Sequence, residues 1–262
     1  MTLAFLEKGQ GTPLVLLHGI GSAARSFRAQ LDELGSRWRV IAWDAPGYGG
    51  SEALPMAHPT AADYADALER FLGERGVGDF HLLGHSLGCL MAAAFAARHP
   101  GRVRSLTLCS IAGGHAHLSE AERKNLLDQR LHDVATLGPS GMAEKRAPRL
   151  LGPAAPPEAL AKLVDTMGSV RPDGYAQAAR MLSTGDIAAD IARLPASLPG
   201  QVIFGDADVI TPPARIGEIA ARWPGAAVHV IAGAGHALYL EQPQAFNALL
   251  AQFLLERAGA PS

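Results

Sequence analysis

The sequence predicts an α/β protein built on a mostly parallel sheet with helices on both faces. Short apolar runs alternate along the chain with longer segments that carry apolar residues at helical spacing. Several of these runs end directly in a glycine or a polar residue, as strands do at the ligand-binding edge of an open parallel sheet. Such alternation requires helical crossovers between parallel strands, and the crossovers place helices on both faces of the sheet.

The predicted elements follow from these runs in chain order. The expected strands are residues 2–6, 14–17, 39–43, 80–83, 105–109, 201–204 and 227–231. The expected helices between the first five strands are about 24–34, 60–74 and 87–98. The alternation stops between about Ala112 and Ser183, where several helical patterns occur without a strand. A capped helix start at Ser119 and a break at Gly138-Pro139 are predicted within this stretch.

The most specific local pattern is Gly-His-Ser-Leu-Gly at residues 84–88, between a predicted strand and a predicted helix. A strand that turns directly into a helix strains the backbone of the middle residue, and only small residues fit two positions to either side. The turn points the Ser86 hydroxyl outward. It also leaves the Leu87 N–H at a helix N-terminus, where it can hold an oxyanion. In this context the pentapeptide predicts a nucleophilic serine.

A serine nucleophile needs a base and an acid that orients the base. In proteins with this type of turn, the acid and then the histidine follow the serine along the chain. Two later predicted strands run into segments that contain Asp208 and His236. The carboxyl ends of parallel strands meet at one edge of the sheet, so a serine, an aspartate and a histidine are expected to meet there.

The chain resembles an α/β-hydrolase fold enzyme over essentially its whole length. Five segments in the family's order carry the resemblance: His18-Gly19-Ile20-Gly21, Asp44 to Ser51, Gly84 to Gly88, Gly205-x-x-Asp208 with Pro212, and Gly235-His236 with Glu241-Gln242-Pro243. The resemblance implies that Ser86 is the nucleophile, Asp208 the acid and His236 the base. It also implies oxyanion-binding N–H groups at Ile20 and Leu87, a sheet of about seven or eight strands, and a reaction that needs no cofactor and no metal.

The resemblance further implies two parts of the chain. Residues 1–112 and 184–262 would form the hydrolase core. Residues 113–183 would form a helical cap, inserted after strand six in the family's numbering, which covers the nucleophile and selects the substrate.

Candidate substrate contacts lie in the cap and in the loops around the nucleophile. If the substrate carries a carboxylate, an arginine should face the serine, because arginine matches a carboxylate in two-pronged geometry. Arg25, Arg130 and Arg146 are the candidates for this role. Tyr48 and Leu238 are further candidates for substrate contacts.

The sequence offers three alternatives to these site assignments. Asp206 is a possible acid, but the family spacing of three residues after the glycine favours Asp208. His85 adjoins the nucleophile and is expected to point away from it in a structural role. His115 and His117 form a His-x-His pair, yet a metal site would need further ligands at suitable spacing, and none is evident in the sequence.

Composition narrows the range of functions. The 262 residues include 23 basic and 25 acidic ones, a formal net charge of −2, which implies neither a nucleic-acid partner nor a membrane surface. Two cysteines, Cys89 and Cys109, favour a reducing compartment. The first residues lack the features of a secretory signal, and no run reaches the ~18 apolar residues of a membrane span. We therefore expect a cytoplasmic monomer or homodimer that acts on a small molecule.

These features predict a serine hydrolase that cleaves a small carboxylic ester or lactone through an acyl-enzyme. The pattern is similar to small bacterial hydrolases of aromatic catabolism, and the 3-oxoadipate enol-lactonases resemble it through Met167 to Tyr175. The sequence of the loop at residues 46–49 differs from the one that those lactonases usually carry. It is shared by C–C bond hydrolases of meta-cleavage products, which are the alternative enzyme class. A ligand receptor on a hydrolase scaffold is the alternative that is not an enzyme. Turnover of an ester beyond one equivalent would distinguish a hydrolase from such a receptor.

Overall fold

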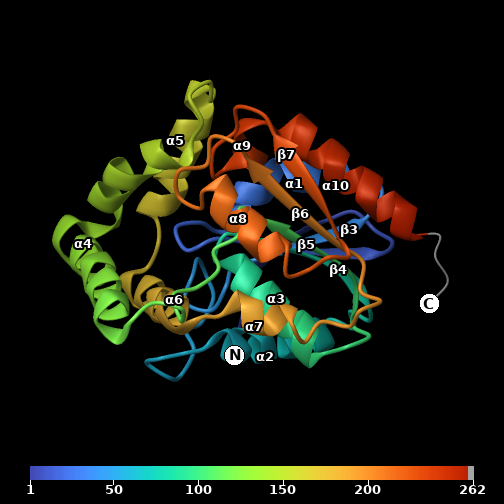
Figure 1. Cartoon of the computed structure of the whole chain (residues 1–262), viewed down its shortest axis with the longest axis horizontal. Coiled ribbons are helices and arrows are strands. Elements are labelled where there is room, and N and C mark those ends of the chain that lie inside the picture. The colour runs from blue at the N-terminus through green and yellow to red at the C-terminus, as the bar shows by residue number, and fades with distance from the viewer. Residues whose placement is uncertain (259–262) are drawn as a thin grey trace.

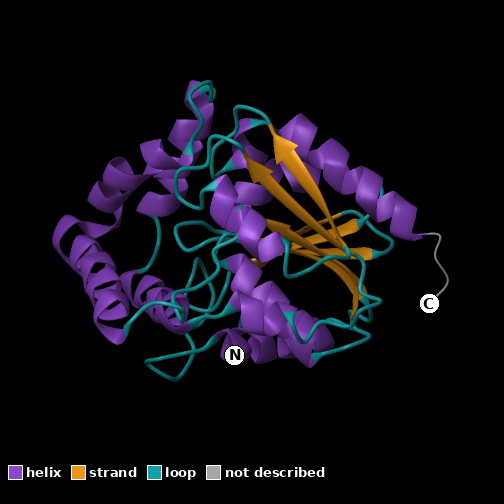
Figure 2. Cartoon of the chain, viewed as in Figure 1, coloured by secondary structure: helices purple, strands orange, loops and turns teal. Residues whose placement is uncertain are grey.

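The computed structural model describes residues 1–258, which form a seven-stranded sheet between two helical layers (Figures 1 and 2). The strand order is β1-β3-β2-β4-β5-β6-β7. Only β1 runs antiparallel to its neighbour, β3. In chain order the strands are Phe5–Lys8, Pro13–Leu17, Arg39–Trp43, Phe80–His85, Val103–Cys109, Gly200–Gly205 and Ala226–Ile231. The predicted fold class, a mostly parallel α/β sheet, is confirmed.

Helices bury both faces of this sheet (Figure 1). One face packs on α2 (Ala61–Gly73), α3 (Gly88–Arg98), α7 (Ile187–Ile191) and α8 (Pro213–Ala220). The other packs on η1 (Ala24–Phe27), α1 (Arg28–Leu34), α9 (Leu238–Glu241) and α10 (Pro243–Ala258). In β2, Val15 and Leu17 face the first layer and Leu14 and Leu16 the second. A strand buried on both faces reads as a continuous apolar run, which explains why these strands were predicted from the sequence.

The first strand lies further along the chain than the predicted residues 2–6. The strand Phe5–Lys8 pairs with β3, whereas the backbone N–H of Ala4 donates to Ser51 Oγ at 2.9 Å. Some backbone groups of residues 2–4 are therefore hydrogen-bonded to a loop that lies 47 residues further along the chain. The apolar pattern at the N-terminus carries no information about that partner.

Between β5 and β6 the described chain contains helices and no strand. α4 (Glu120–Arg146) begins with a capping box at Ser119, as predicted, and breaks at Gly138, whose φ is 65°, just before a proline. The segment continues as η2 (Ala147–Leu150), α5 (Pro157–Gly168) and α6 (Pro172–Thr184).

These helices lie together to one side of the sheet, on the side to which the parallel strands point (Figures 1 and 2). α4 packs against both α5 and α6. The segment follows the fifth strand of this chain. The predicted position, after strand six, uses the family's strand numbering, in which one further strand precedes those of this chain. Within residues 1–258, no helix combines the length and the apolar character needed to cross a membrane.

Candidate active site

The predicted nucleophile lies in the turn between β4 and α3. Ser86 has a φ of 53°, in the left-handed region that side chains rarely adopt. A Cβ on Gly84 would lie 2.4 Å from the Gly88 carbonyl oxygen, and a Cβ on Gly88 would lie 2.2 Å from the Leu17 carbonyl oxygen. Both positions therefore require glycine, as the sequence pattern predicts. The tight turn leaves the Ser86 hydroxyl at the carboxyl edge of the sheet.

Ser86, His236 and Asp208 form one hydrogen-bonded chain. His236 Nε2 lies 2.8 Å from Ser86 Oγ, and His236 Nδ1 lies 2.9 Å from Asp208 Oδ2. The Asp208 and His236 side chains are buried. Because an ionised carboxylate only accepts hydrogen bonds, Nδ1 carries the proton and Nε2 is left to accept from the serine. This is the arrangement that a histidine base and a hydroxyl nucleophile need.

The loop after β6 holds Asp208 in its ionised form. Asp208 Oδ1 accepts the N–H groups of Ile210 and Thr211 at 2.8 and 2.9 Å, and Oδ2 accepts the Thr211 hydroxyl at 2.8 Å. Burial opposes ionisation, but the hydrogen bond from His236 and those from Thr211 outweigh it and hold the pKa of Asp208 below its usual value. Thr211 was not among the predicted site residues. Its only signal is its position three residues after the acid.

Asp206, the alternative acid, takes another role. Its side chain is exposed, and its Oδ1 accepts the Gly233 N–H at 2.6 Å. This bond ties the end of β6 to the loop after β7. No hydrogen bond or ion pair joins Asp206 to His236 in the described residues.

The loop after β2 is oriented by two buried side chains. The Gly19 carbonyl accepts from His18 Nδ1 at 2.8 Å and from the Ser22 N–H at 3.1 Å. The Tyr48 hydroxyl donates to the Ile20 carbonyl at 2.6 Å. In a trans peptide the N–H points opposite to the carbonyl of the same unit, so fixing the Gly19 carbonyl also fixes the direction of the Ile20 N–H.

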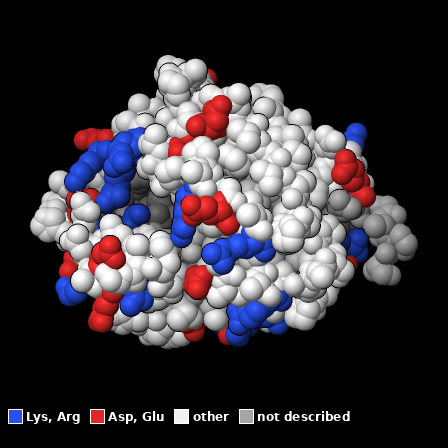
Figure 3. Space-filling model, in the orientation of Figure 1, with Lys and Arg blue, Asp and Glu red and all other residues white. Residues whose placement is uncertain are grey.

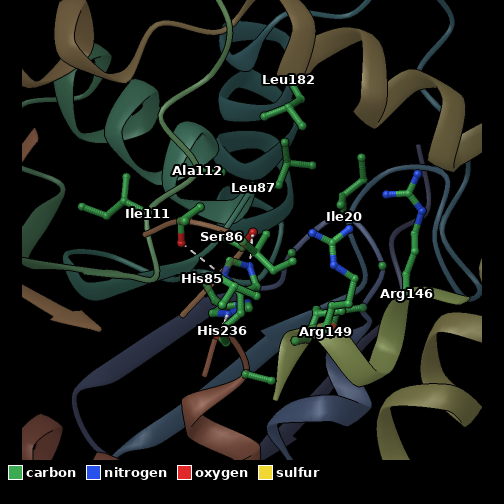
Figure 4. A pocket seen from close by; sticks show the side chains of 18 of the residues that line it. Ile20, His85, Ser86, Leu87, Ile111, Ala112, Arg146, Arg149, Leu182 and His236 are labelled. Atoms are coloured by element: carbon green, nitrogen blue, oxygen red, sulfur yellow. Dashed lines mark hydrogen bonds between the residues drawn. The ribbon is translucent and has the colours of Figure 1, made fainter. Parts of the chain in front are cut away.

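The N–H groups of Ile20 and Leu87 are both free to bind an anion. Neither donates to any acceptor within residues 1–258. Both residues line the cavity close to Ser86 (Figure 4). Two unpaired backbone donors beside a nucleophile are what an oxyanion hole requires.

His85 and Cys89 flank the serine in supporting positions. His85 Nε2 donates to the His236 carbonyl at 2.9 Å, and burial lowers the pKa of His85 to about 3, so this ring stays neutral. The Cys89 thiol donates to the Gly84 carbonyl at 3.1 Å. Burial raises the pKa of Cys89, which keeps the sulfur in its poorly nucleophilic protonated form.

A cavity of about 420 Å³ lies over Ser86 and His236. Its floor is made by the loops at the carboxyl ends of the strands. The segment between β5 and β6 adds side chains from four of its helices, among them Met142, Leu150, Leu163, Met167, Tyr175 and Leu182. A cavity of this size and partly apolar lining suits a small molecule.

The structure brings only some of the predicted substrate contacts to this cavity. Arg130 and Arg146 line it. Arg25 does not, because its guanidinium group donates to the end of α5 outside the cavity. Tyr48 lies beneath the loop after β2, and Leu238 is packed between the sheet and α10, so neither lines the cavity.

Two further arginines in the cavity wall, Arg149 and Arg215, were not predicted. Arg149 lies in η2, three residues after Arg146 in a stretch already proposed to cover the site, and that proximity was the available signal. Arg215 lies in α8, a helix outside the predicted cap.

Glu241 belongs to the fifth of the segments that resemble the family. It connects the segment between β5 and β6 to the loop that carries His236. Its buried carboxylate accepts the Gly152 N–H at 2.8 Å and the Gly235 N–H at 3.0 Å. The Ala237 N–H donates to the Leu150 carbonyl at 2.9 Å, close by. The position of η2 is thereby coupled to the position of His236.

Replacing Glu241 with glutamine is expected to destabilise the fold by about 1–3 kcal/mol. Glu241 Oε2 accepts from both Gly152 and Gly235, and Oε1 accepts from Gly235 at 3.0 Å. An amide has one acceptor oxygen, so its NH₂ would face the Gly235 N–H, a second donor, in a buried site. Urea unfolding of the wild type and the variant measures this loss. Glu74→Gln, at an exposed ion pair, is the control and should change stability by less than about 0.5 kcal/mol. Equal midpoints for both variants would contradict the assigned role.

Comparison with known proteins places these features in a family. The family model described as "Alpha/beta hydrolase family" matches residues 14–249. A pimeloyl-[acyl-carrier protein] methyl ester esterase from Chromobacterium violaceum is 29% identical over 98% of this chain and 100% of its own length. Other curated relatives, named as acetyl- or acyltransferases, are longer, and this chain spans between 30% and 66% of them.

Solved structures agree on the fold. A thermophilic esterase from Thermogutta terrifontis, solved with malate bound, has a TM-score of 0.88 and 30% identity, covering 97% of this chain and 93% of its own. The enol-lactonase from Burkholderia xenovorans LB400 has a TM-score of 0.85 and 24% identity, covering 97% and 96%. At that identity the second likeness bears on the fold alone.

Proposed function

This chain belongs to the alpha/beta hydrolase family, and we propose that it is a serine hydrolase of a small carboxylic ester or lactone. The observation that carries the proposal is the hydrogen-bonded chain from Ser86 through His236 to Asp208, beside two unpaired N–H groups. The names of two relatives support ester cleavage. One is an ester esterase matched over its full length, and the other is an esterase of the same fold at 30% identity.

The first half of the proposed reaction forms an acyl-enzyme. His236 Nε2 takes the Ser86 proton while Oγ attacks the carbonyl carbon, and the carbonyl oxygen becomes an anion held by the Ile20 and Leu87 N–H groups. Asp208 stabilises the imidazolium that forms. The tetrahedral intermediate then collapses, the bond to the leaving oxygen breaks, and that oxygen takes the proton from Nε2.

The second half releases the acid. Water gives a proton to His236 Nε2 as its oxygen attacks the acyl carbon, and the same two N–H groups hold the second oxyanion. The bond to Ser86 Oγ breaks, and Oγ takes the proton back from Nε2. With a lactone, the leaving oxygen stays attached to the acyl chain, and the product is a single hydroxy acid.

We further propose that residues 113–183 act as the cap that selects the substrate. The supporting observation is that this segment supplies much of the wall of the cavity over Ser86, whereas the reacting groups come from the sheet's loops. The bonds of Glu241 and Ala237 to Gly152 and Leu150 would hold the cap in register with the base.

A panel of short aryl esters, lactones and dienoates against the purified protein tests the proposal. We expect repeated turnover of at least one ester or lactone, and labelling of Ser86 by a fluorophosphonate probe. Turnover of dienoates in preference to esters would favour a C–C bond hydrolase. Release of no more than one equivalent of product from every compound would favour a ligand receptor and contradict the proposal.

A further inference from the structure

Positive charge gathers around the cavity over Ser86. Four arginines line it, namely Arg130, Arg146, Arg149 and Arg215. No aspartate or glutamate is among the lining residues in the part of the chain that the structure describes. Figure 3 shows basic side chains around the hollow on this face of the molecule. A cavity lined by one sign of charge concentrates its field and attracts ligands of the opposite sign.

Two of these arginines form ion pairs with protein carboxylates. Arg146 Nη2 lies 2.5 Å from Asp133 Oδ2, and Asp133 is almost fully buried. Arg215 Nη1 lies 2.7 Å from Glu218 Oε2. These ion pairs anchor the two side chains, although Asp133 is shared with Lys145, whose Nζ lies 2.9 Å from Oδ1.

Arg130 and Arg149 have no carboxylate partner and no hydrogen-bond partner for their guanidinium groups within residues 1–258. Each guanidinium presents five donors in a planar fork that fits two oxygens of one anion. The protein's own groups leave that donor capacity unused. At the cavity, Arg149 is exposed and Arg130 is half-buried.

Arg149 is placed next to the reacting groups. The residue after it, Leu150, accepts a hydrogen bond from Ala237, the neighbour of His236. In Figure 4 the Arg149 guanidinium points into the pocket on the side of Ile20 and Ser86, while Arg146 points further from them. Arg130 lies half-buried on α4. Burial and then the positive charge of Arg130 lower the pKa of His115, and the same charge opposes the rise that burial causes in the pKa of Tyr48.

We propose that the substrate is an anionic ester or lactone, whose carboxylate or phosphate group is held by Arg149 together with Arg130 while Ser86 attacks the carbonyl. This inference rests on the proposed hydrolase function. Charge-assisted, two-pronged bonds from arginine would fix the position of the substrate and would select it over neutral esters of the same length.

Two matched substrates test this selection: the 4-nitrophenyl monoester of adipic acid and 4-nitrophenyl hexanoate, which differ in a terminal carboxylate against a methyl group. We expect wild-type kcat/KM to favour the adipate ester about 10-fold or more. In Arg149→Ala the ratio of the two kcat/KM values should fall about 10- to 100-fold. Arg37→Ala, at the opposite edge of the sheet, should leave the ratio unchanged. High salt should reduce the adipate rate selectively.

Calorimetric titration of the wild type with adipate and with butyl phosphate separates the two anions and needs no turnover. Binding of either compound that is weakened at least 10-fold in Arg149→Ala supports the inference that these arginines hold an anion. If such binding is found but no ester is hydrolysed, the proposed hydrolase function fails and the anion site stands. Turnover of the hexanoate ester with no preference for the adipate ester, and no binding of either anion, overturns the inference and leaves the hydrolase proposal standing.

Discussion

Ser86→Ala is expected to abolish ester hydrolysis, with a loss on the order of 10⁶-fold in kcat. The variant removes the atom that would bond to the acyl carbon, and among residues 1–258 no other nucleophile is placed to replace it. The Cys89 thiol is held protonated by burial and donates to a backbone carbonyl. Steady-state kinetics with the best substrate of the ester and lactone panel measures the loss.

Ser110→Ala is the matched control for this prediction. Ser110 is the other described non-glycine residue with a positive φ, 45°, and its buried hydroxyl has no hydrogen-bond partner. Activity should survive this change, and a fluorophosphonate probe should label the control variant but not Ser86→Ala. Retained turnover in Ser86→Ala, or labelling at Cys89 or Ser110, would refute the assignment of the nucleophile.

Asp208→Asn is expected to reduce kcat by roughly 10⁴-fold while the protein stays folded. The N–H groups of Ile210 and Thr211 that now bind Oδ1 would select the amide oxygen for that position. The amide NH₂ would then face His236 Nδ1, which would have to accept a hydrogen bond. The imidazole proton would move to Nε2, and Nε2 could no longer take the proton from Ser86. Steady-state kinetics, with circular dichroism to check folding, measures the effect.

Asp206→Asn makes the control for the acid. Asp206 accepts one backbone hydrogen bond from the Gly233 N–H and has no bond to His236, so its amide should keep most of the activity. If Asp206→Asn costs more activity than Asp208→Asn, the acid lies two residues earlier than the structure indicates.

The residues of the proposed triad were predictable because each lies directly after a strand. Continuous apolar runs mark strands that are buried on both faces, and parallel strands bring their carboxyl ends to one edge. Ser86, Asp208 and His236 could therefore be placed together before their distances were known. The requirement for glycine at position 84 is local, because a Cβ there would meet Gly88 in the same turn. At position 88 it comes from the Leu17 carbonyl of the neighbouring strand β2.

The sequence by itself determined the sheet, the serine turn and the three residues at its edge, since all of these depend on local pattern and on strand direction. Only the tertiary structure decided which arginine faces the site. Arg25 binds the end of α5, and Arg149 is brought to the cavity by a hydrogen bond between Leu150 and Ala237. The direction of a long charged side chain depends on partners more than 80 residues away, such as the Glu241–Gly152 contact, and no local pattern records them.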